Sequence, residues 1–173
     1  AAYGMDLEQG WVSLLNRRLE QQGLDYRMIN ASISGDTSGG GLRRLPDLVV
    51  RYHPAIVIIE LGGNDGLRGY PINQLRANLS EMTRQAMEAG ARVLLAAIEI
   101  PPNLGPRYSK LFRASFPEVA QQTGASATSF ILQGIATERT LMQEDGIHPT
   151  AQAQSQIVDN LWPYLEPLLE PDP

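Results

Sequence analysis

The stretch "AIVIIELG" (55–62) decides the fold class of this chain. Its apolar residues continue without alternation, a pattern typical of a parallel strand that helices cover on both faces. A second run, "ARVLLAAIEI" (91–100), has the same character. Helical spacing fills the segment between them, 71–90, and Gly90 suits the end of that helix. We therefore predict two buried parallel strands joined by a helix.

The remaining segments extend this alternation. Apolar spacing predicts further helices over 8–22, 41–52, 107–123 and 149–168, and two weaker strands over 26–32 and 125–131. Pro149 suits the first position of the last helix. Strands that alternate with helices indicate a parallel sheet with right-handed crossovers. We expect one three-layer α/β/α domain over residues 1–173.

Composition excludes several classes of protein. The 173 residues are 43% hydrophobic and 19% charged, as in a soluble globular domain. No apolar run approaches the ~20 residues that span a bilayer. A net charge of −5 without a basic cluster argues against a nucleic-acid surface. The absence of cysteine excludes a disulfide and a thiolate nucleophile.

Three polar, glycine-rich segments follow the predicted strands. They are "ISGDTSGGG" (33–41), "LGGNDGLRGY" (61–70) and "DGIHPT" (145–150). In open parallel sheets the ligand site forms outside the carboxyl ends of the strands, where such loops converge. The order of elements alone therefore gathers these segments into one candidate site.

The first two segments each leave two interpretations open. Gly35 either permits a positive φ angle at a turn or lets a substrate approach a backbone N–H that donates to an oxyanion. Asn64 is either a turn residue or the donor of a side-chain amide hydrogen bond. Ser34 and Ser38 flank Gly35, and Ser34 suits a residue that bonds its own turn.

The third segment pairs an acid with a histidine. Asp145 lies three residues before His148, close enough to orient the imidazole as a base, although the same pattern also suits the start of a helix. His53, the other histidine, precedes its strand at the amino end of the sheet and suits an ordinary loop. A metal site is disfavoured, because no second histidine is near His148. The sequence also lacks a G-x-S-x-G elbow and a phosphate-binding G-x-x-x-x-G-K-[ST] loop.

Taken in order, "NASISGDTSGGGLRRLP", "IELGGNDGLRG" and "MQEDGIHPTAQAQ" resemble the SGNH (GDSL) hydrolase family, in its bacterial arylesterase, acyl-CoA thioesterase I and lysophospholipase L1 group. The resemblance implies a flavodoxin-like sheet of five parallel strands and a serine esterase that needs no cofactor and no metal. It also implies that Gly35 and Asn64 form the oxyanion hole, and that Asp145 and His148 are the acid and base of a triad.

One part of the family pattern is not in the printed residues. The family places its nucleophilic serine in a "GDSLS"-like block, at the end of the first strand and directly before an A-x-Y segment, and this chain begins "AAYGM". A parallel sheet without an interior strand would leave backbone groups unpaired. We therefore expect a strand and the serine just upstream of Ala1.

The resemblance also implies a substrate site. Segments 65–70 and 99–108 correspond to those that line the acyl groove of the family. Substrate contacts are expected from five residues, namely Gly63, Asp65, Leu67, Pro102 and Leu104. For Pro101, Pro102 and Leu104, packing within the loop is the alternative.

We expect a shallow groove for short to medium acyl chains, on aryl esters, acyl-CoA thioesters or lysophospholipids. We also expect a periplasmic or secreted monomer that has no nucleic-acid partner and does not insert stably into the membrane. Two alternatives stay open at this stage. One is an SGNH carbohydrate O-acetylesterase, and the other is a non-catalytic acyl-binding module if the chain truly begins at Ala1.

Overall fold

A computed structural model describes residues 1–169 of the chain. The residues form two compact units, each built from two separate pieces of sequence. The first unit comprises 1–34 and 132–162, and the second comprises 35–131 and the residues from Pro163 onward. The expectation of one domain over 1–173 stays a prediction.

The second unit is built on a parallel sheet. Its strands are β1 (Ile56–Ile59), β2 (Arg92–Leu95) and β3 (Ser126–Ala127), in the order β1-β2-β3. Ile56 pairs with Arg92, and Leu94 pairs with Ser126. The two apolar runs therefore form parallel strands as predicted, and the α/β fold class is confirmed.

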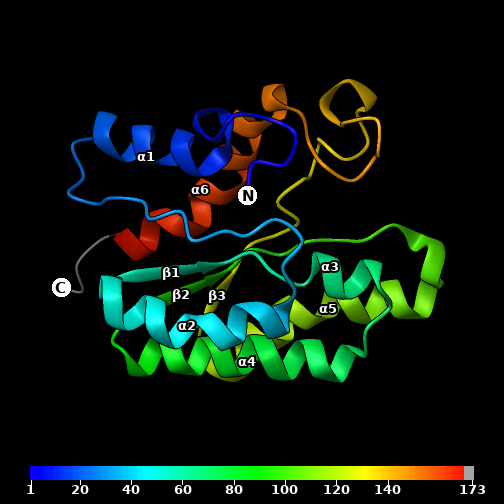
Figure 1. Cartoon of the computed structure of the whole chain (residues 1–173), viewed down its shortest axis with the longest axis horizontal. Coiled ribbons are helices and arrows are strands. Elements are labelled where there is room, and N and C mark those ends of the chain that lie inside the picture. Colours follow the sequence, from blue (N-terminus) through cyan, green and yellow to red (C-terminus); the bar gives the residue numbers. More distant parts are fainter. Residues whose placement is uncertain (170–173) are drawn as a thin grey trace. The chain divides into compact units, whose positions relative to one another are not determined.

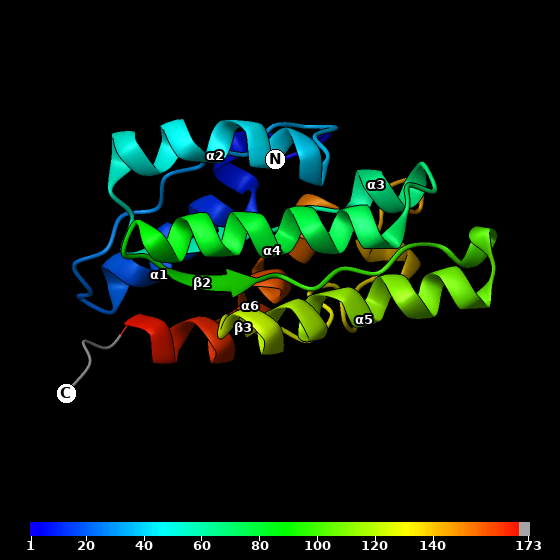
Figure 2. The ribbon, with the colours of Figure 1, turned by 90° about the horizontal axis from the view of Figure 1, so that it is seen from below.

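Helices of the second unit alternate with these strands. They are α2 (Ser38–Tyr52), α3 (Gly63–Leu67), α4 (Ile72–Glu88) and α5 (Pro106–Thr123), with a short 3-10 turn, η2 (Pro102–Leu104). Helix α4 lies between α2 and α5 and packs on β2 (Figures 1 and 2). Fully buried Leu79, Leu95, Phe112 and Phe116 belong to the core beneath the sheet. Packing of these apolar faces fixes the loops at the carboxyl ends of the strands.

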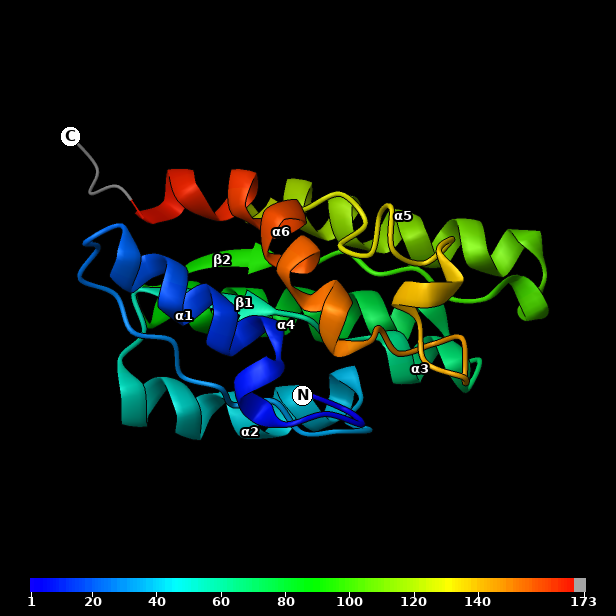
Figure 3. The same cartoon turned by 90° about the horizontal axis from the view of Figure 1, so that it is seen from above.

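The first unit joins the two ends of the chain. It contains η1 (Leu7–Gln9), α1 (Trp11–Gln21), η3 (Arg139–Leu141), η4 (Ala151–Ala153) and α6 (Gln154–Leu169) as far as Trp162. Helix α1 lies beside this part of α6 (Figure 3). Arg18 of α1 forms an ion pair with Asp159, and the side chain of Gln154 accepts the N–H of Trp11 at 3.0 Å.

Two expected elements differ from the structure. The segment 26–32 forms no strand, and two of its backbone donors bond to partners outside any sheet: Tyr26 N–H donates to the Leu24 carbonyl, and Met28 N–H donates to the Asn16 side chain of α1. The last helix does not begin at Pro149. That proline forms an antiparallel bridge with Met142, and η4 and α6 begin after Thr150.

No helix within residues 1–169 is long and apolar enough to cross a membrane.

Candidate active site

A hairpin in the first unit holds the acid and the histidine. The N–H of Thr150 donates to Leu141 O at 2.8 Å, and Gln143 N–H donates to His148 O at 2.8 Å. Within this frame, Asp145 Oδ2 lies 2.7 Å from His148 Nδ1. The predicted acid and base are therefore in direct contact, and Nε2 is the ring nitrogen that faces away from the carboxylate.

The backbone of the turn fixes the carboxylate as well. Asp145 Oδ1 accepts the N–H groups of Ile147 at 2.9 Å and His148 at 3.0 Å. The hydrogen bond to the His148 ring, followed by these backbone donors, lowers the pKa of Asp145 to about 2. At neutral pH the residue is an anion, which suits the stabilisation of a neighbouring imidazolium.

Tyr3 covers one face of the imidazole and was missed from the sequence. Its ring stacks on that of His148, with centroids 4.1 Å apart and planes inclined by 25°. Gln143 Nε2 donates to Tyr3 O at 2.8 Å and to Pro149 O at 3.1 Å, which ties the start of the chain to the hairpin. The position of Tyr3 in the "AAY" segment is the sequence signal that could have identified it.

In the second unit the structure brings Gly35 and Asn64 together. Gly35 is exposed in a turn with φ +77°, and a Cβ built there would have no atom within 4 Å. Asn64, the second residue of α3, donates Nδ2–H to the carbonyl of Asp36 at 3.0 Å. A primary amide has a second N–H, which remains to donate to an oxyanion.

Ser38, one of the serines near these donors, is engaged in the fold. Ser38 is the first residue of α2 and is fully buried, and its hydroxyl donates to Asp65 Oδ1 at 2.5 Å. Ser34 lies in the turn that precedes Gly35. The other serines weighed as nucleophiles lie in α1, α4 and α5, namely Ser13, Ser80 and Ser109.

The residues expected to contact the substrate occupy different environments. Leu67 and Leu104 are 38% and 41% exposed, and Pro102 is also exposed. Gly63 begins α3 and is half-buried. Asp65 is only 3% exposed and both its oxygens accept from Ser38, so it offers a substrate almost no surface.

The segments that follow α3 and precede α5 lie side by side. The hydroxyl of Tyr108 donates to Tyr70 O at 2.6 Å. Burial, and then the negative charge of Asp65, raise the pKa of Tyr108, which keeps this donor protonated. A Cβ at Gly69 would lie 3.6 Å from a methyl group of Leu104. The two segments that the sequence assigned to the acyl groove are thus neighbours.

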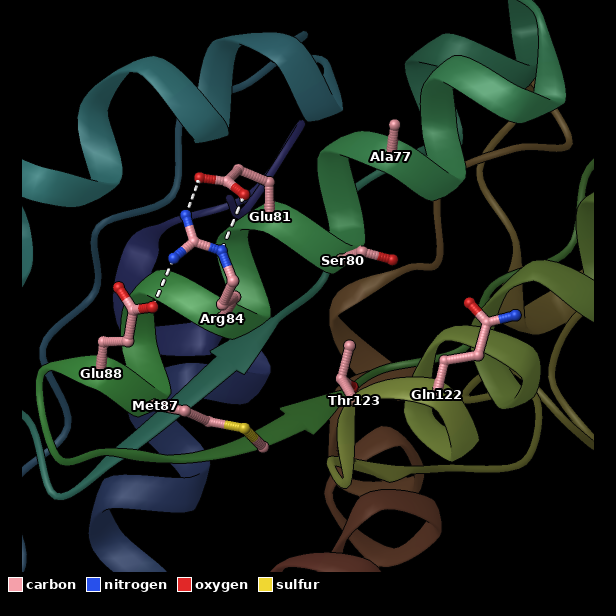
Figure 4. Close-up of a pocket in the computed structure, with 8 residues that line it drawn as sticks. All are labelled: Ala77, Ser80, Glu81, Arg84, Met87, Glu88, Gln122 and Thr123. Atoms are coloured by element: carbon pink, nitrogen blue, oxygen red, sulfur yellow. Dashed lines mark hydrogen bonds and ion pairs between the residues drawn. The ribbon is translucent and has the colours of Figure 1, made fainter.

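A hollow elsewhere in the second unit contains none of the predicted site residues. It lies between α4 and α5, and Figure 4 shows Arg84 held by Glu81 and Glu88 on its wall. Hydrogen bonds from Arg84 and Gln85 lower the pKa of Glu81. Because Arg84 is already paired with two carboxylates, it is not a free cation that would attract an anionic ligand to the hollow.

Metal ligands are not clustered in the part of the chain that the structure describes. No group of three or more His, Asp or Glu side chains there is arranged to hold an ion.

Known proteins are similar to this chain in sequence and in fold. A model of the GDSL-like Lipase/Acylhydrolase family matches residues 1–155. Esterase TesA of Pseudomonas aeruginosa is 52% identical over 169 residues, which are 98% of this chain and 84% of that protein. Thioesterase 1/protease 1/lysophospholipase L1 of Escherichia coli strain K12 is 38% identical over 172 residues, covering 99% of this chain and 81% of that protein.

The fold agrees as well. A crystal structure of TesA superimposes with a TM-score of 0.95 at 52% identity, covering 97% of this chain and 93% of the other. Identity of this degree over nearly the whole chain, with a family match from the first residue to 155, leaves one conclusion. The chain belongs to the GDSL-like lipase/acylhydrolase family, as the blocks around Gly35, Asn64 and His148 predicted.

Proposed function

We propose that this esterase, of the TesA type, cleaves its esters and thioesters through an acyl-enzyme with His148 as the base. The contact between Asp145 Oδ2 and His148 Nδ1, at 2.7 Å, is the observation that carries the proposal. It fixes the tautomer in which Nδ1 holds the proton, so that Nε2 has a lone pair to receive another. The ionised Asp145 then stabilises the imidazolium.

The nucleophile in this proposal is the serine of the GDSLS-like block, which the family places just upstream of the segment matching Ala1–Tyr3. His148 Nε2 takes the serine proton while the serine oxygen bonds to the carbonyl carbon. Tyr3, which follows this block closely in sequence, stacks on His148. That contact supports the assignment, because it brings the start of the chain to the base.

The developing oxyanion is held by two donors of the second unit. Gly35 contributes its N–H at an exposed turn, and Asn64 contributes the N–H of its side chain that Asp36 does not occupy. Loss of one such donor lowers kcat by about 10²–10³-fold. Collapse of the tetrahedral species expels the alcohol or thiol, which takes the proton from His148.

Deacylation repeats the chemistry with water. His148 removes a proton from water as the water oxygen attacks the carbonyl carbon of the acyl-enzyme. The serine then leaves with the proton from His148, and the carboxylic acid is released. Each proton that His148 accepts is returned within the same half-reaction. The cycle needs no electron transfer.

Substrate preference is proposed from the exposed apolar residues. Leu67 ends α3, the helix that carries Asn64, and Leu104 lies beside Gly69; both present aliphatic surface, which suits an acyl chain of short to medium length. Aryl esters, acyl-CoA thioesters and lysophospholipids offer such chains with different leaving groups. The relative from E. coli is named for thioesterase and lysophospholipase activities.

Two matched substitutions, one at each histidine, provide the test. The chain has two histidines, so His148→Asn and His53→Asn are the same substitution at the base and at the end of α2. In the full-length protein, His148→Asn should lower kcat on p-nitrophenyl butyrate by about 10³-fold or more, and His53→Asn should not change kcat. Equal loss in both variants would contradict the role of His148.

Trapping with a fluorophosphonate identifies the nucleophile. Intact mass should show one adduct, and peptide mapping should place it on the serine that precedes the segment matching Ala1. An adduct on Ser34 or Ser38 would contradict this placement. A folded full-length protein without any adduct would favour a non-catalytic acyl-binding module.

A further inference from the structure

Asp65 is a buried carboxylate that the proposed reaction does not use. It is 3% exposed and directly follows Asn64 in α3. Oδ2 accepts the backbone N–H of Ser38 at 2.8 Å, and Oδ1 accepts the Ser38 hydroxyl at 2.5 Å. One side chain therefore receives both donors of the first residue of α2.

Physical chemistry makes this contact strong. The first N–H groups of a helix have no partner within the helix, and the positive end of the helix dipole favours an anion there. A buried carboxylate is costly unless donors satisfy it, and Ser38 supplies two. The contact thus gives a partner to an unpaired N–H group of α2 and satisfies the buried carboxylate of Asp65.

Helix α4 anchors the same contact from the other side. Asn78 is 7% exposed, and its Nδ2–H donates to Ser38 Oγ at 2.9 Å. Gln74 Nε2–H in turn donates to Asn78 Oδ1 at 2.9 Å. The Ser38 hydroxyl therefore both donates and accepts, which fixes its rotation.

The start of α2 and the start of α3 are joined by this network. Ser38 lies three residues after Gly35, and Asp65 lies one residue after Asn64. A second bond runs from Asn64 Nδ2–H in α3 to Asp36 O, just before α2, at 3.0 Å. These bonds hold the segment that follows Gly35 against the start of α3. They therefore constrain the separation of the Gly35 N–H and the Asn64 amide.

We propose that Asp65, acting through Ser38, is a positioning residue for the oxyanion hole of this enzyme. This inference rests on the proposed function, which assigns Gly35 and Asn64 to that hole. Asp65 does not act as a base, because Ser38 occupies both its oxygens inside the core. Its effect on the reaction passes through the geometry of the two donors.

Asp65→Asn tests the proposal in the full-length protein. The asparagine side chain keeps the shape of the aspartate but turns an NH2 group toward one Ser38 donor. The spacing between the start of α2 and the start of α3 should therefore change. We expect kcat on p-nitrophenyl butyrate to fall by about 10–100-fold with KM within about threefold, because the donors bind the transition state more than the ground state.

A double-mutant cycle separates positioning from general stability. If Asp65 acts through Asn64, the loss caused by Asp65→Asn should shrink to less than about threefold in the Asn64→Ala background. Multiplicative losses in the double variant would overturn the proposal. An Asn64→Ala enzyme with unchanged kcat would instead contradict the proposed function.

Ser115 provides a matched control for Ser38. Both serines are fully buried in the second unit, and each hydroxyl donates one hydrogen bond and accepts another; for Ser115 the partners are Leu111 O at 2.9 Å and Arg76 Nε at 3.0 Å. Ser38→Ala should lower kcat by about tenfold or more, and Ser115→Ala should leave kcat unchanged at similar thermal stability. Equal losses of kcat would overturn the proposal, even if Asp65→Asn does not fold.

Discussion

Asp145 shows how a few short contacts define the charge of one residue. Three donors from the turn surround its carboxylate, and they lower its pKa from 3.8 to about 2. A depressed acid contributes to folding at pH values above its unfolded pKa, and the contribution disappears as the pH falls through the folded pKa. Its side chain is 35% exposed, so solvent weakens each contact.

Asp145→Asn should therefore lower the free energy of unfolding in a way that depends on pH. The gap between the two proteins should be complete above about pH 5, shrink below pH 4 and close near pH 2, because the protonated acid has lost its charge-assisted bonds. Urea unfolding across this range measures the gap. A gap of constant size would mean that packing, and not charge, is responsible.

Single residues also mark the limit of what the sequence predicted. The contact of Asp145 with His148 could be expected, because three residues of chain bring them together. The buried position of Asp65 could not, because its partner Ser38 is 27 residues away and only the fold unites them. Tyr3 is separated from His148 by still more sequence, so its stacking has no local signal.

Helix α2 shows how the space around a helix restricts which residues it can contain. It begins at Ser38, earlier than the helical spacing over 41–52 predicted, because Thr37 accepts the N–H of Gly40 as an N-cap. After Ser38, the first turn consists of three glycines, Gly39, Gly40 and Gly41. Their conformation is ordinary, so the reason for glycine lies in the space around them.

Gly39 and Gly40 should respond oppositely to alanine. A Cβ at Gly39 would meet no atom closer than 3.7 Å, so Gly39→Ala should raise the free energy of unfolding by up to about 1 kcal/mol through helix propensity. A Cβ at Gly40 would lie 1.7 Å from Asp36 Oδ1, so Gly40→Ala should lower it by about 1–3 kcal/mol. Urea unfolding distinguishes the two, and the same sign in both variants would contradict this view of the turn.

Strands and helices were predictable to different degrees. Strand β1 and helix α4 carry long, regular patterns and lie where the sequence placed them. Residues 26–29 alternate between half-buried and exposed side chains as in a strand, but a strand is defined by backbone pairing, which a local pattern does not predict. Helix α3 was read as a turn, because five residues rich in glycine have no helical periodicity.

On the scale of the whole molecule, the two ends of the chain depend on each other. The first unit combines residues 1–34 with 132–162, so its packing is completed only when both pieces are present. Contacts between residues so distant in sequence are slow to form, because the entropy of a long loop must be lost first. We therefore expect this unit to depend on the few bonds that join the pieces.

Gln154 provides one of these bonds. It is 4% exposed, and its side chain accepts Trp11 N–H at 3.0 Å and donates to Thr150 O at 3.2 Å. Gln154→Ala leaves the buried Trp11 N–H without this partner and should lower the free energy of unfolding by about 1–3 kcal/mol. Amide hydrogen exchange should then quicken in α1.

Gln152 is the control for this change, since it is exposed in the neighbouring turn η4. Gln152→Ala should leave both stability and the exchange of α1 unchanged. Unchanged exchange in Gln154→Ala would show that the apolar contacts of the unit hold α1 without the hydrogen bond.

The stacking of Tyr3 on His148 also makes the base visible to magnetic resonance. Protons over the face of an aromatic ring resonate upfield, and this ring lies 4.1 Å from the imidazole. The chain has only two histidines, so its imidazole spectrum contains two sets of signals. Tyr3→Leu should shift one set downfield and leave that of His53 in place. A spectrum in which neither set moves would refute the stacking, whereas the expected shift would assign the catalytic imidazole without further labelling.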